Sequence, residues 1–445
     1  MKNESYAQVI VVGAGIAGLT AAWELKKLGI QALVLEAAER VGGRMQSIQI
    51  DDALIDCGAQ FLSSAYTVIP QLIKETGLSD KFVATNEWVG FVRNKGIAVI
   101  HPQKPWHLVS KHVLSIWNLL RLGFNQFKLF NIQHKSLPLN DITAWAQYDN
   151  QLANNFVAKN FGESVASELT SAIFNGFYFQ SLYDSSAAMA ATVLAFSAHH
   201  PKTMTLTSGM GSLPRKLADQ LNVKTNIAVS TIIESSASVK IISESDEFNA
   251  DHVILAVPAP IAKDIIQHPD AATLALLKTP YSSSATISLL TDEHWKPPAS
   301  ISSVYGFIFN PREKSKIAAL TFENNKCQNR KKEGYLVNVM LSDEWAKQLL
   351  SLPDEAIYAE VQADIESVLP HIHQHLQTKK LFRWPFAMPR TPIGRANAVK
   401  QYRDSRDSGN RIWLAGDYLG LPWTDSAAQT GIWAANQVAK HLQVK

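Results

Sequence analysis

The strongest constraint on the fold lies near the start of the chain, where an apolar run meets a cluster of glycines. Residues 8–15, QVIVVGAG, are typical of a buried parallel strand that ends in a tight turn. The next stretch, IAGLTAAWELKKLG, has apolar residues at helical spacing and Gly29 at its expected end. QALVLEA then indicates a second buried strand. Residues 8–37 are therefore expected to form a βαβ unit.

The glycines between the first strand and the helix have the spacing G-x-G-x-x-G. In this context Gly13 permits the turn, Gly15 lets a pyrophosphate approach the backbone, and Gly18 lets the helix pack closely on the strand. Free N–H groups and the helix dipole favour phosphate at a helix N-terminus. The sequence therefore predicts a dinucleotide site there, with Ile16 and Ala17 among the contacts.

The residues after the second strand narrow the choice of dinucleotide. Glu36 ends that strand, next to Ala37, and its carboxylate can accept hydrogen bonds from ribose hydroxyls. A second glycine pair and a cation, Gly42, Gly43 and Arg44, follow shortly. This loop can fold back over the pyrophosphate, and the guanidinium can neutralise its charge. Simple nicotinamide dehydrogenases lack such an extension.

With this GGR signature the sequence resembles the flavoprotein family of amine oxidases, protoporphyrinogen oxidases and carotenoid desaturases. The C-terminal LAGD and the helix-like WTDSAAQTGIWAAN agree with that resemblance. It implies non-covalent FAD, with Gly416 and Asp417 at the ribityl chain. It also implies that Ser426 and Ala427 offer backbone N–H groups to the flavin pyrimidine, where a helix dipole stabilises negative charge.

The resemblance implies further site residues. The segment IDCGAQF, with Ala59 and Gln60, corresponds to the one that passes the flavin ring, and Val229 to a backbone contact with adenine. Trp384 and Trp423 would wall the substrate site, and Gln60 would orient the substrate. The flavin itself accepts a hydride, so the protein needs no nucleophile of its own.

The expected fold is α/β, with a Rossmann-type FAD-binding domain and a discontinuous, mixed α+β substrate domain. The nucleotide-binding strands are separated along the chain, at its start, middle and end. We therefore expect 1–90, 205–264 and 381–445 to form the FAD-binding domain. Residues 91–204 and 265–380 would form the substrate-binding domain with a helical cap.

Composition excludes several other classes of function. A hydrophobic content of 46% indicates a folded core, and a net charge of +3 is too small to favour nucleic acid. Cys57 and Cys327 have no CxxC spacing, and the 13 histidines show no metal-ligand pattern, so neither a disulfide framework nor a metal is expected. No signal peptide or membrane span is evident, which favours a cytoplasmic enzyme.

One segment, from Trp88 to Asn140, contains neither Asp nor Glu. Its middle is strongly apolar with helical spacing. Three interpretations stay open: a cap with a solvated basic face, a helix on the inner membrane surface through 104–135, or a basic mouth for an acidic substrate. The cations of the segment are Arg93, Lys95, Lys104, Lys111, Arg121, Lys128 and Lys135.

In the middle of the chain, stretches such as NFGESVASELTSAIFNGFY and SGMGSLPRKLADQL resemble bacterial protoporphyrinogen and coproporphyrinogen oxidases. The lysine that many amine oxidases use to hold a water near the flavin is replaced here, near Ala285. Trp423 follows GLP, and its large indole would narrow the pocket, which disfavours a full tetrapyrrole as substrate. No second G-x-G-x-x-G is present for NADPH. We therefore expect hydride removal from a porphyrinogen or smaller pyrrole-like ring, with oxygen or a quinone-like acceptor. The alternatives are an amine oxidase, a desaturase or isomerase of a lipid-like chain, and a catalytically silent flavoprotein.

Overall fold

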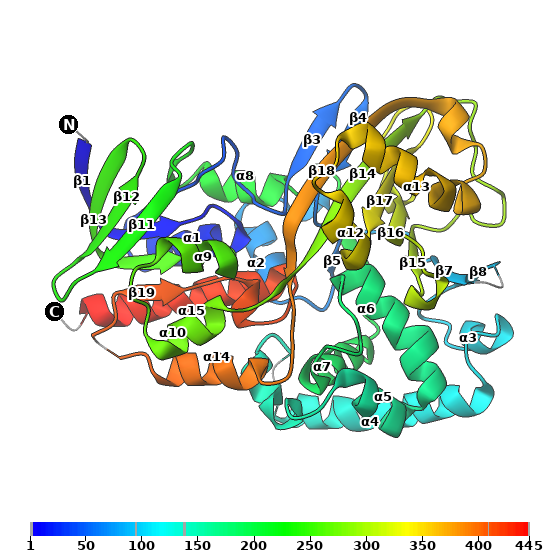
Figure 1. Ribbon diagram of the computed structural model, residues 1–445, viewed down its shortest axis with the longest axis horizontal. Helices are drawn as coiled ribbons and strands as arrows, with labels where there is room; N and C mark the ends of the chain where they lie inside the picture. The colour runs from blue at the N-terminus through cyan, green and yellow to red at the C-terminus, as the bar shows by residue number, and fades with distance from the viewer. Residues whose placement is uncertain (1–2, 94–95, 137–138, 408, 444–445) are drawn as a thin grey trace.

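The computed structural model describes residues 3–93, 96–136, 139–407 and 409–443. Its elements gather around two large sheets, one toward each end of the long axis of the molecule (Figure 1). Both ends of the chain lie at the end of the molecule that holds the first sheet, and both contribute to it, through β1 and β19.

The first sheet has the order β10-β2-β1-β13-β12-β11, with β19 paired to β13. Its central strands are parallel, and its last two pairs are antiparallel. The core side chains of the central strands are apolar and buried, as parallel strands covered on both faces require. The strands are β1 (Asn3–Val12), β2 (Ala32–Leu35), β10 (Asn222–Lys224), β11 (Val229–Glu234), β12 (Val239–Ser243), β13 (Asp246–Leu255) and β19 (Ile412–Leu414).

Helices α1 (Ile16–Lys27) and α15 (Thr424–Gln443) are far apart in sequence, but they pack against each other over this sheet. A Cβ atom added at Gly431 would lie 2.2 Å from the Ala17 carbonyl oxygen, so glycine permits this close approach. The smaller helices around the first sheet are α8 (Ser212–Ala218), α9 (Ala259–Ile265), α10 (Ala271–Leu277) and α14 (Arg395–Asp404).

The second sheet has the order β18-β14-β17-β16-β15-β7-β8. Every residue of β14, β16 and β17 is buried. Helices α12 (Asp343–Leu349) and α13 (Asp354–Val368) lie near it in Figure 1. The strands are β7 (Val89–Arg93), β8 (Gly96–Ile100), β14 (Tyr281–Thr291), β15 (Gly306–Phe309), β16 (Ile317–Phe322), β17 (Leu336–Leu341) and β18 (Leu376–Pro389).

Helices gather below the second sheet in Figure 1 and form the cap. They are α3 (His107–Ser110), α4 (Ile116–Ser136), α5 (Ala153–Phe161), the π-helical turn η3 (Val165–Thr170), α6 (Ser171–Tyr178) and α7 (Ala187–Ser197), with the 3₁₀ turn η2 (Ile142–Tyr148). The strands β3 (Ser47–Ile50) and β4 (Ala53–Asp56) form a hairpin, and β5 (Leu62–Ser63), β9 (Thr203–Leu206) and β6 (Phe82–Ala84) form a third small sheet. Two further helices are α2 (Val68–Glu75) and α11 (Glu323–Lys326).

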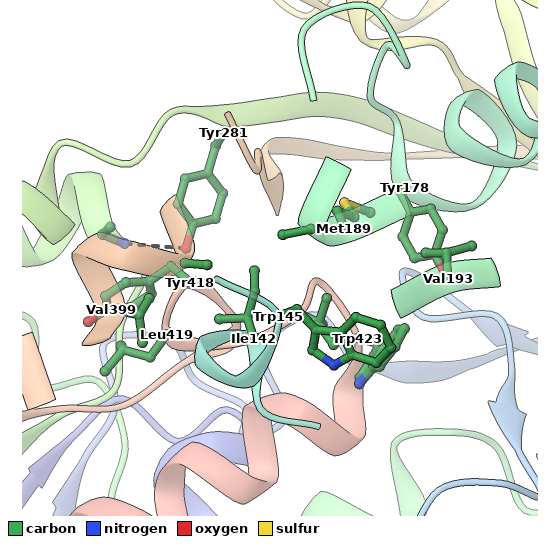
Figure 2. Close-up of a cluster of buried hydrophobic side chains, with 14 of the residues drawn as sticks. Ile142, Trp145, Tyr178, Met189, Val193, Tyr281, Val399, Tyr418, Leu419 and Trp423 are labelled. Carbon is green, nitrogen blue, oxygen red and sulfur yellow. Dashed lines mark hydrogen bonds between the residues drawn. The ribbon is translucent and has the colours of Figure 1, made fainter. Parts of the chain in front are cut away.

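A shared apolar core joins the cap to the first sheet. Met189 of α7 and Tyr178 of α6 gather with Tyr281, Tyr418 and Trp423 in the buried cluster of Figure 2. The cap is therefore packed onto the elements that carry the C-terminal motif.

The expected domain boundaries cut through continuous elements. The boundary after residue 90 falls within β7, and the boundary after residue 380 falls within β18. Both strands belong to the second sheet. The division into two domains at these residues stays a prediction.

Candidate functional site

The first glycine loop combines crowded positions with one open position. Gly13 has a φ of +102°, and an added Cβ atom would lie 2.8 Å from the Ala256 carbonyl oxygen. A Cβ atom at Gly18 would lie 2.0 Å from the Gly13 carbonyl oxygen. Gly15 differs, because it has an extended backbone and its Cβ atom would meet nothing within 4 Å. The fold itself requires Gly13 and Gly18, whereas Gly15 leaves space for a ligand.

The second glycine loop lies against the first. The N–H of Gly42 donates to the carbonyl oxygen of Ala14 at 2.8 Å, and Gly15 and Gly42 form a parallel bridge. Gly42 and Gly43 have φ values of +109° and +53°, which favour glycine. The GGR loop therefore lies against the first glycine loop, and its position over a pyrophosphate stays a prediction.

Glu36 ties the end of β2 to the first glycine loop. Its carboxylate accepts from the N–H of Ala14 at 2.7 Å and from that of Ala38 at 2.9 Å. A carboxylate offers about four acceptor positions, so it can still accept from a ribose hydroxyl. Ala37 is exposed beside it.

The strand β11 begins beside the same end of β2. The N–H of Ile227 donates to the carbonyl oxygen of Glu36 at 2.8 Å. Val229, two residues further on, is half-buried. Its contact with adenine stays a prediction.

Arg44 joins three segments that are far apart in sequence. Its guanidinium forms two hydrogen bonds with the carboxylate of Asp417, at 2.6 and 3.1 Å, and donates to the Ala387 carbonyl oxygen at 2.8 Å. Burial acts to lower the pKa of Arg44, but the Asp417 carboxylate outweighs it and the pKa is raised. The sequence assigned this charge to a pyrophosphate. In the structure the carboxylate of Asp417 neutralises the charge of Arg44, so a phosphate contact by Arg44 stays a prediction.

The LAGD turn has a backbone that only glycine adopts readily. Gly416 has a φ of +144°, and its added Cβ atom would lie 2.8 Å from the Tyr418 ring. Asp417 is buried, and the hydroxyl of Tyr281 donates to its carboxylate at 3.5 Å. Sequence reasoning missed Tyr281, which begins the long strand β14.

The segment from Cys57 to Gln60 lies between Arg44 and Trp384. The N–H of Ala59 donates to the Arg44 carbonyl oxygen at 2.8 Å, and the indole N–H of Trp384 donates to the Cys57 carbonyl oxygen at 3.0 Å. The structure therefore brings together Arg44, Ala59, Gln60 and Trp384, which the sequence assigned to one site.

Gln60 is 8% exposed, and its amide is held by the protein. The amide nitrogen donates to the carbonyl oxygens of Asp56 and Gly58, both at 3.0 Å. The amide oxygen accepts from Asn338 at 3.0 Å. This rigid setting would fix the orientation of Gln60, while its contact with substrate stays a prediction.

Trp423 precedes α15 and packs against Tyr66 and Phe196, with ring centroids 6.3 and 5.2 Å away. Its indole N–H is buried and has no partner within the described chain. The N–H of Ala427 donates to the Trp423 carbonyl oxygen at 3.1 Å. The N–H of Ala427 was expected to be free for the flavin, but it already forms a hydrogen bond in the first turn of the helix. Ser426 lies one residue earlier and has no intrahelical acceptor for its N–H.

A buried network of four charged side chains lies next to Gln60, and no pattern in the sequence predicts it. Asp56 accepts from Lys326 at 2.6 Å and pairs with Arg330 at 2.9 Å, while Glu323 pairs with Lys326 at 3.0 Å. All four side chains are fully buried. Burial acts to raise the pKa of Asp56, but the two cations outweigh it and the pKa is lowered. Two carboxylates thus balance two cations.

Arg395, at the start of α14, is another buried cation that sequence reasoning missed. It donates to the Thr279 hydroxyl at 2.6 Å, and its Nε and Nη2 have no partner within the described residues. Burial lowers its pKa to about 10, so it stays charged at neutral pH.

Together these residues fit a dinucleotide. Open space at Gly15, the free N–H groups at the start of α1, and the carboxylate of Glu36 meet the needs of a pyrophosphate and a ribose. In the part of the chain that the structure describes, no three His, Cys, Asp or Glu side chains gather as a metal site requires.

Comparison with known proteins agrees with this geometry. A family model described as flavin containing amine oxidoreductase matches residues 16–439. Coproporphyrinogen III oxidase of Bacillus subtilis (strain 168) is 23% identical, over 96% of this chain and 94% of that protein.

Solved structures share the fold. Wild-type putrescine oxidase bound to putrescine superposes with a TM-score of 0.76 at 17% identity and covers 100% of both chains. Cyclohexylamine oxidase from Brevibacterium oxydans IH-35A gives a TM-score of 0.75 at 16% identity, over 98% of this chain and 99% of that one. The predicted fold class is confirmed.

Proposed function

The chain belongs to the flavin-containing amine oxidoreductase family and is an FAD-dependent oxidase, and we propose that it removes a hydride from a small, hydrophobic, nitrogen-containing substrate. The substrate class we favour is a porphyrinogen or a smaller pyrrole-like ring. The acceptor we favour for the electrons is oxygen. The reacting bond is a C–H bond beside nitrogen or within a partly reduced ring.

The ranking of pyrrole-like rings above amines depends on Ala285. The amine oxidase branch resembled by this sequence has a lysine near this position, which holds a water beside the flavin. Ala285 lies within β14, is fully buried, and pairs in register with Arg383. An apolar side chain there cannot hold such a water. The resemblance to coproporphyrinogen III oxidase over nearly the whole of both proteins supports the same ranking.

The residues of the site have distinct tasks in this proposal. Gly15 and the N-terminus of α1 would hold the pyrophosphate, and Glu36 the adenosine ribose. FAD, when bound, supplies the hydride acceptor. Trp384 would exclude water from one side of the reacting centre, while Gln60, fixed by Asn338, would orient the substrate.

Anaerobic reduction of the purified holoenzyme tests the proposal. Coproporphyrinogen III, protoporphyrinogen IX, putrescine and cyclohexylamine would each be mixed with the yellow protein while its visible absorbance is followed. We expect bleaching by a porphyrinogen and none by the amines. Bleaching by an amine alone would replace the proposal with an amine oxidase. Bleaching by none of the four would reject both the porphyrinogens and these amines as substrates.

The electron acceptor needs a separate measurement. Reduced enzyme would be mixed with air-saturated buffer or with an anaerobic quinone, and hydrogen peroxide would be measured in the first case. We expect rapid return of the yellow colour in air with formation of peroxide. Rapid reoxidation by quinone and slow reoxidation in air would identify a dehydrogenase.

A further inference from the structure

Helix α4 carries a row of large apolar side chains that the fold leaves exposed. Trp117, Leu120, Phe124 and Phe127 are 76%, 58%, 61% and 62% exposed. They recur every three or four residues, so they share one side of the helix. The side chains that α4 buries, Leu122 and Leu129 among them, lie on another side, and α4 packs on α5 and α7. The helix therefore has two apolar faces, and only one is used by the fold.

Further exposed apolar side chains lie on the turn before α3 and at the start of α4. Trp106, the residue that precedes α3, is 59% exposed, and Ile116 at the start of α4 is 50% exposed. Single exposed apolar residues are common on proteins, but a contiguous patch of this kind marks an interaction surface. In Figure 1, α4 runs along the outer edge of the molecule, below the other cap helices.

Cations border this face, and the segment has no acid of its own. Between Trp88 and Asn140 the sequence contains no Asp or Glu. The ammonium group of Lys128 lies 4.3 Å from the centre of the Phe124 ring, and Lys104 and Lys111 flank α3. Lys95 and the side chain of Lys135 lie outside the described residues. An acidic partner would complement the charge of this surface.

We propose that α4 and the turn that carries Trp106 bind the surface of a membrane that contains anionic phospholipids. Aromatic side chains with flanking lysines on one side of a helix suit the boundary between lipid headgroups and acyl chains. Among the residues that the structure describes, none of the helices has the length and hydropathy of a membrane span. A helix that binds through one apolar side lies in the plane of the membrane surface.

Charge favours a membrane over a second copy of this chain. Two copies joined through this face would bring the same lysines together, and like charges repel. An anionic bilayer accepts the cations at its headgroups and the aromatic rings below them.

Sedimentation of the full-length holoenzyme with vesicles tests the proposal. Phosphatidylcholine vesicles would be compared with vesicles of phosphatidylcholine and phosphatidylglycerol. We expect binding to the anionic vesicles that weakens between about 0.1 M and about 1 M salt, because the Debye length falls from about 10 Å to about 3 Å. Failure to bind the anionic vesicles at low salt would overturn the proposal.

Variants of exposed residues separate this surface from general adhesion. Trp117→Ser combined with Phe124→Ser and Phe127→Ser should reduce vesicle binding at least about tenfold, since the apolar anchor is lost. Lys128→Glu should weaken binding to anionic vesicles at least about fivefold. The control is Tyr6→Ser, which removes a 66% exposed aromatic from β1 and should bind as the parent does.

Two readouts keep the result unambiguous. The flavin content of each variant reports whether it is folded, because these side chains lie on the surface. Light scattering reports the mass in solution. A triple variant that binds vesicles like the parent would overturn the proposal. The proposal would also be overturned if the parent is a dimer that does not bind vesicles and the triple variant is a monomer.

Discussion

Replacing Gly15 by valine should separate cofactor binding from folding. The backbone of Gly15 has φ −73° and ψ 176°, which any residue can adopt, and its added Cβ atom meets nothing within 4 Å. The folded apoprotein should therefore accept the side chain. Loss of glycine freedom in the unfolded chain stabilises a compatible site by about 0.4–1 kcal/mol for an alanine, and we expect an effect of similar size here.

The same substitution should weaken the binding of FAD. The new side chain occupies the space through which a pyrophosphate approaches the N-terminus of α1. If two charge-assisted hydrogen bonds of about 1.5–3 kcal/mol each are lost, binding weakens by about 3–6 kcal/mol. At about 1.4 kcal/mol for each factor of ten, the dissociation constant rises roughly 10²- to 10⁴-fold.

Two measurements on the apoprotein check this prediction. Thermal unfolding followed by circular dichroism gives its stability, and titration with FAD followed by quenching of flavin fluorescence gives its affinity. Gly18→Ala is the matched control, because its Cβ atom would lie 2.0 Å from the Gly13 carbonyl oxygen and should disrupt the fold itself. A yellow Gly15→Val protein with parental affinity, or an unfolded one, would refute the reasoning.

Two further predictions concern single carboxylates. Glu36→Ala should weaken FAD binding by roughly 10- to 150-fold, the equivalent of one charge-assisted hydrogen bond of about 1.5–3 kcal/mol, and equilibrium dialysis would measure it; unchanged affinity would remove Glu36 from the site. Because the pKa of Asp56 is lowered in the folded protein, its ionisation stabilises the fold above the unfolded pKa of about 3.9, and this stability is lost as the pH falls below that value. Asp56→Asn should lower the free energy of unfolding in urea by about 3–5 kcal/mol at neutral pH, since it leaves Lys326 and Arg330 with one carboxylate. The stability of this variant should also depend less on pH in the acid range. A variant as stable as the parent would show that the network contributes no net stability.

Much of the nucleotide-binding fold could be predicted from the sequence because its signals are local. Apolar runs predicted the strands β1 and β2, and the glycine spacing predicted the turn between β1 and α1. Each of these features is decided within about twenty residues, so neighbouring positions carry the information.

Pairings between distant residues could not be predicted in this way. The chain separates Arg44 from Asp417 by 373 positions and Asp56 from Lys326 by 270. A charged residue in a sequence is usually solvated, and no local pattern distinguishes the few that are buried with a partner. The length of β18 also depends on a distant segment, because this strand pairs with β14, and the expected boundary after residue 380 lies within it.

Helix α4 shows where periodicity stops being informative. Its sequence is apolar on two faces, so helical spacing predicts a helix without deciding which face packs against α7. Only the tertiary structure shows that Leu122 and Leu129 are buried, whereas Trp117, Phe124 and Phe127 face outward. Packing alone gives no reason for three aromatic rings on the outside of a cap. Because α7 lies between α4 and Trp423, a membrane at α4 would stand one helix away from the indole expected beside the flavin. The apolar outer face therefore links the cap to a surface beyond the protein, and the vesicle experiment decides whether that surface is lipid.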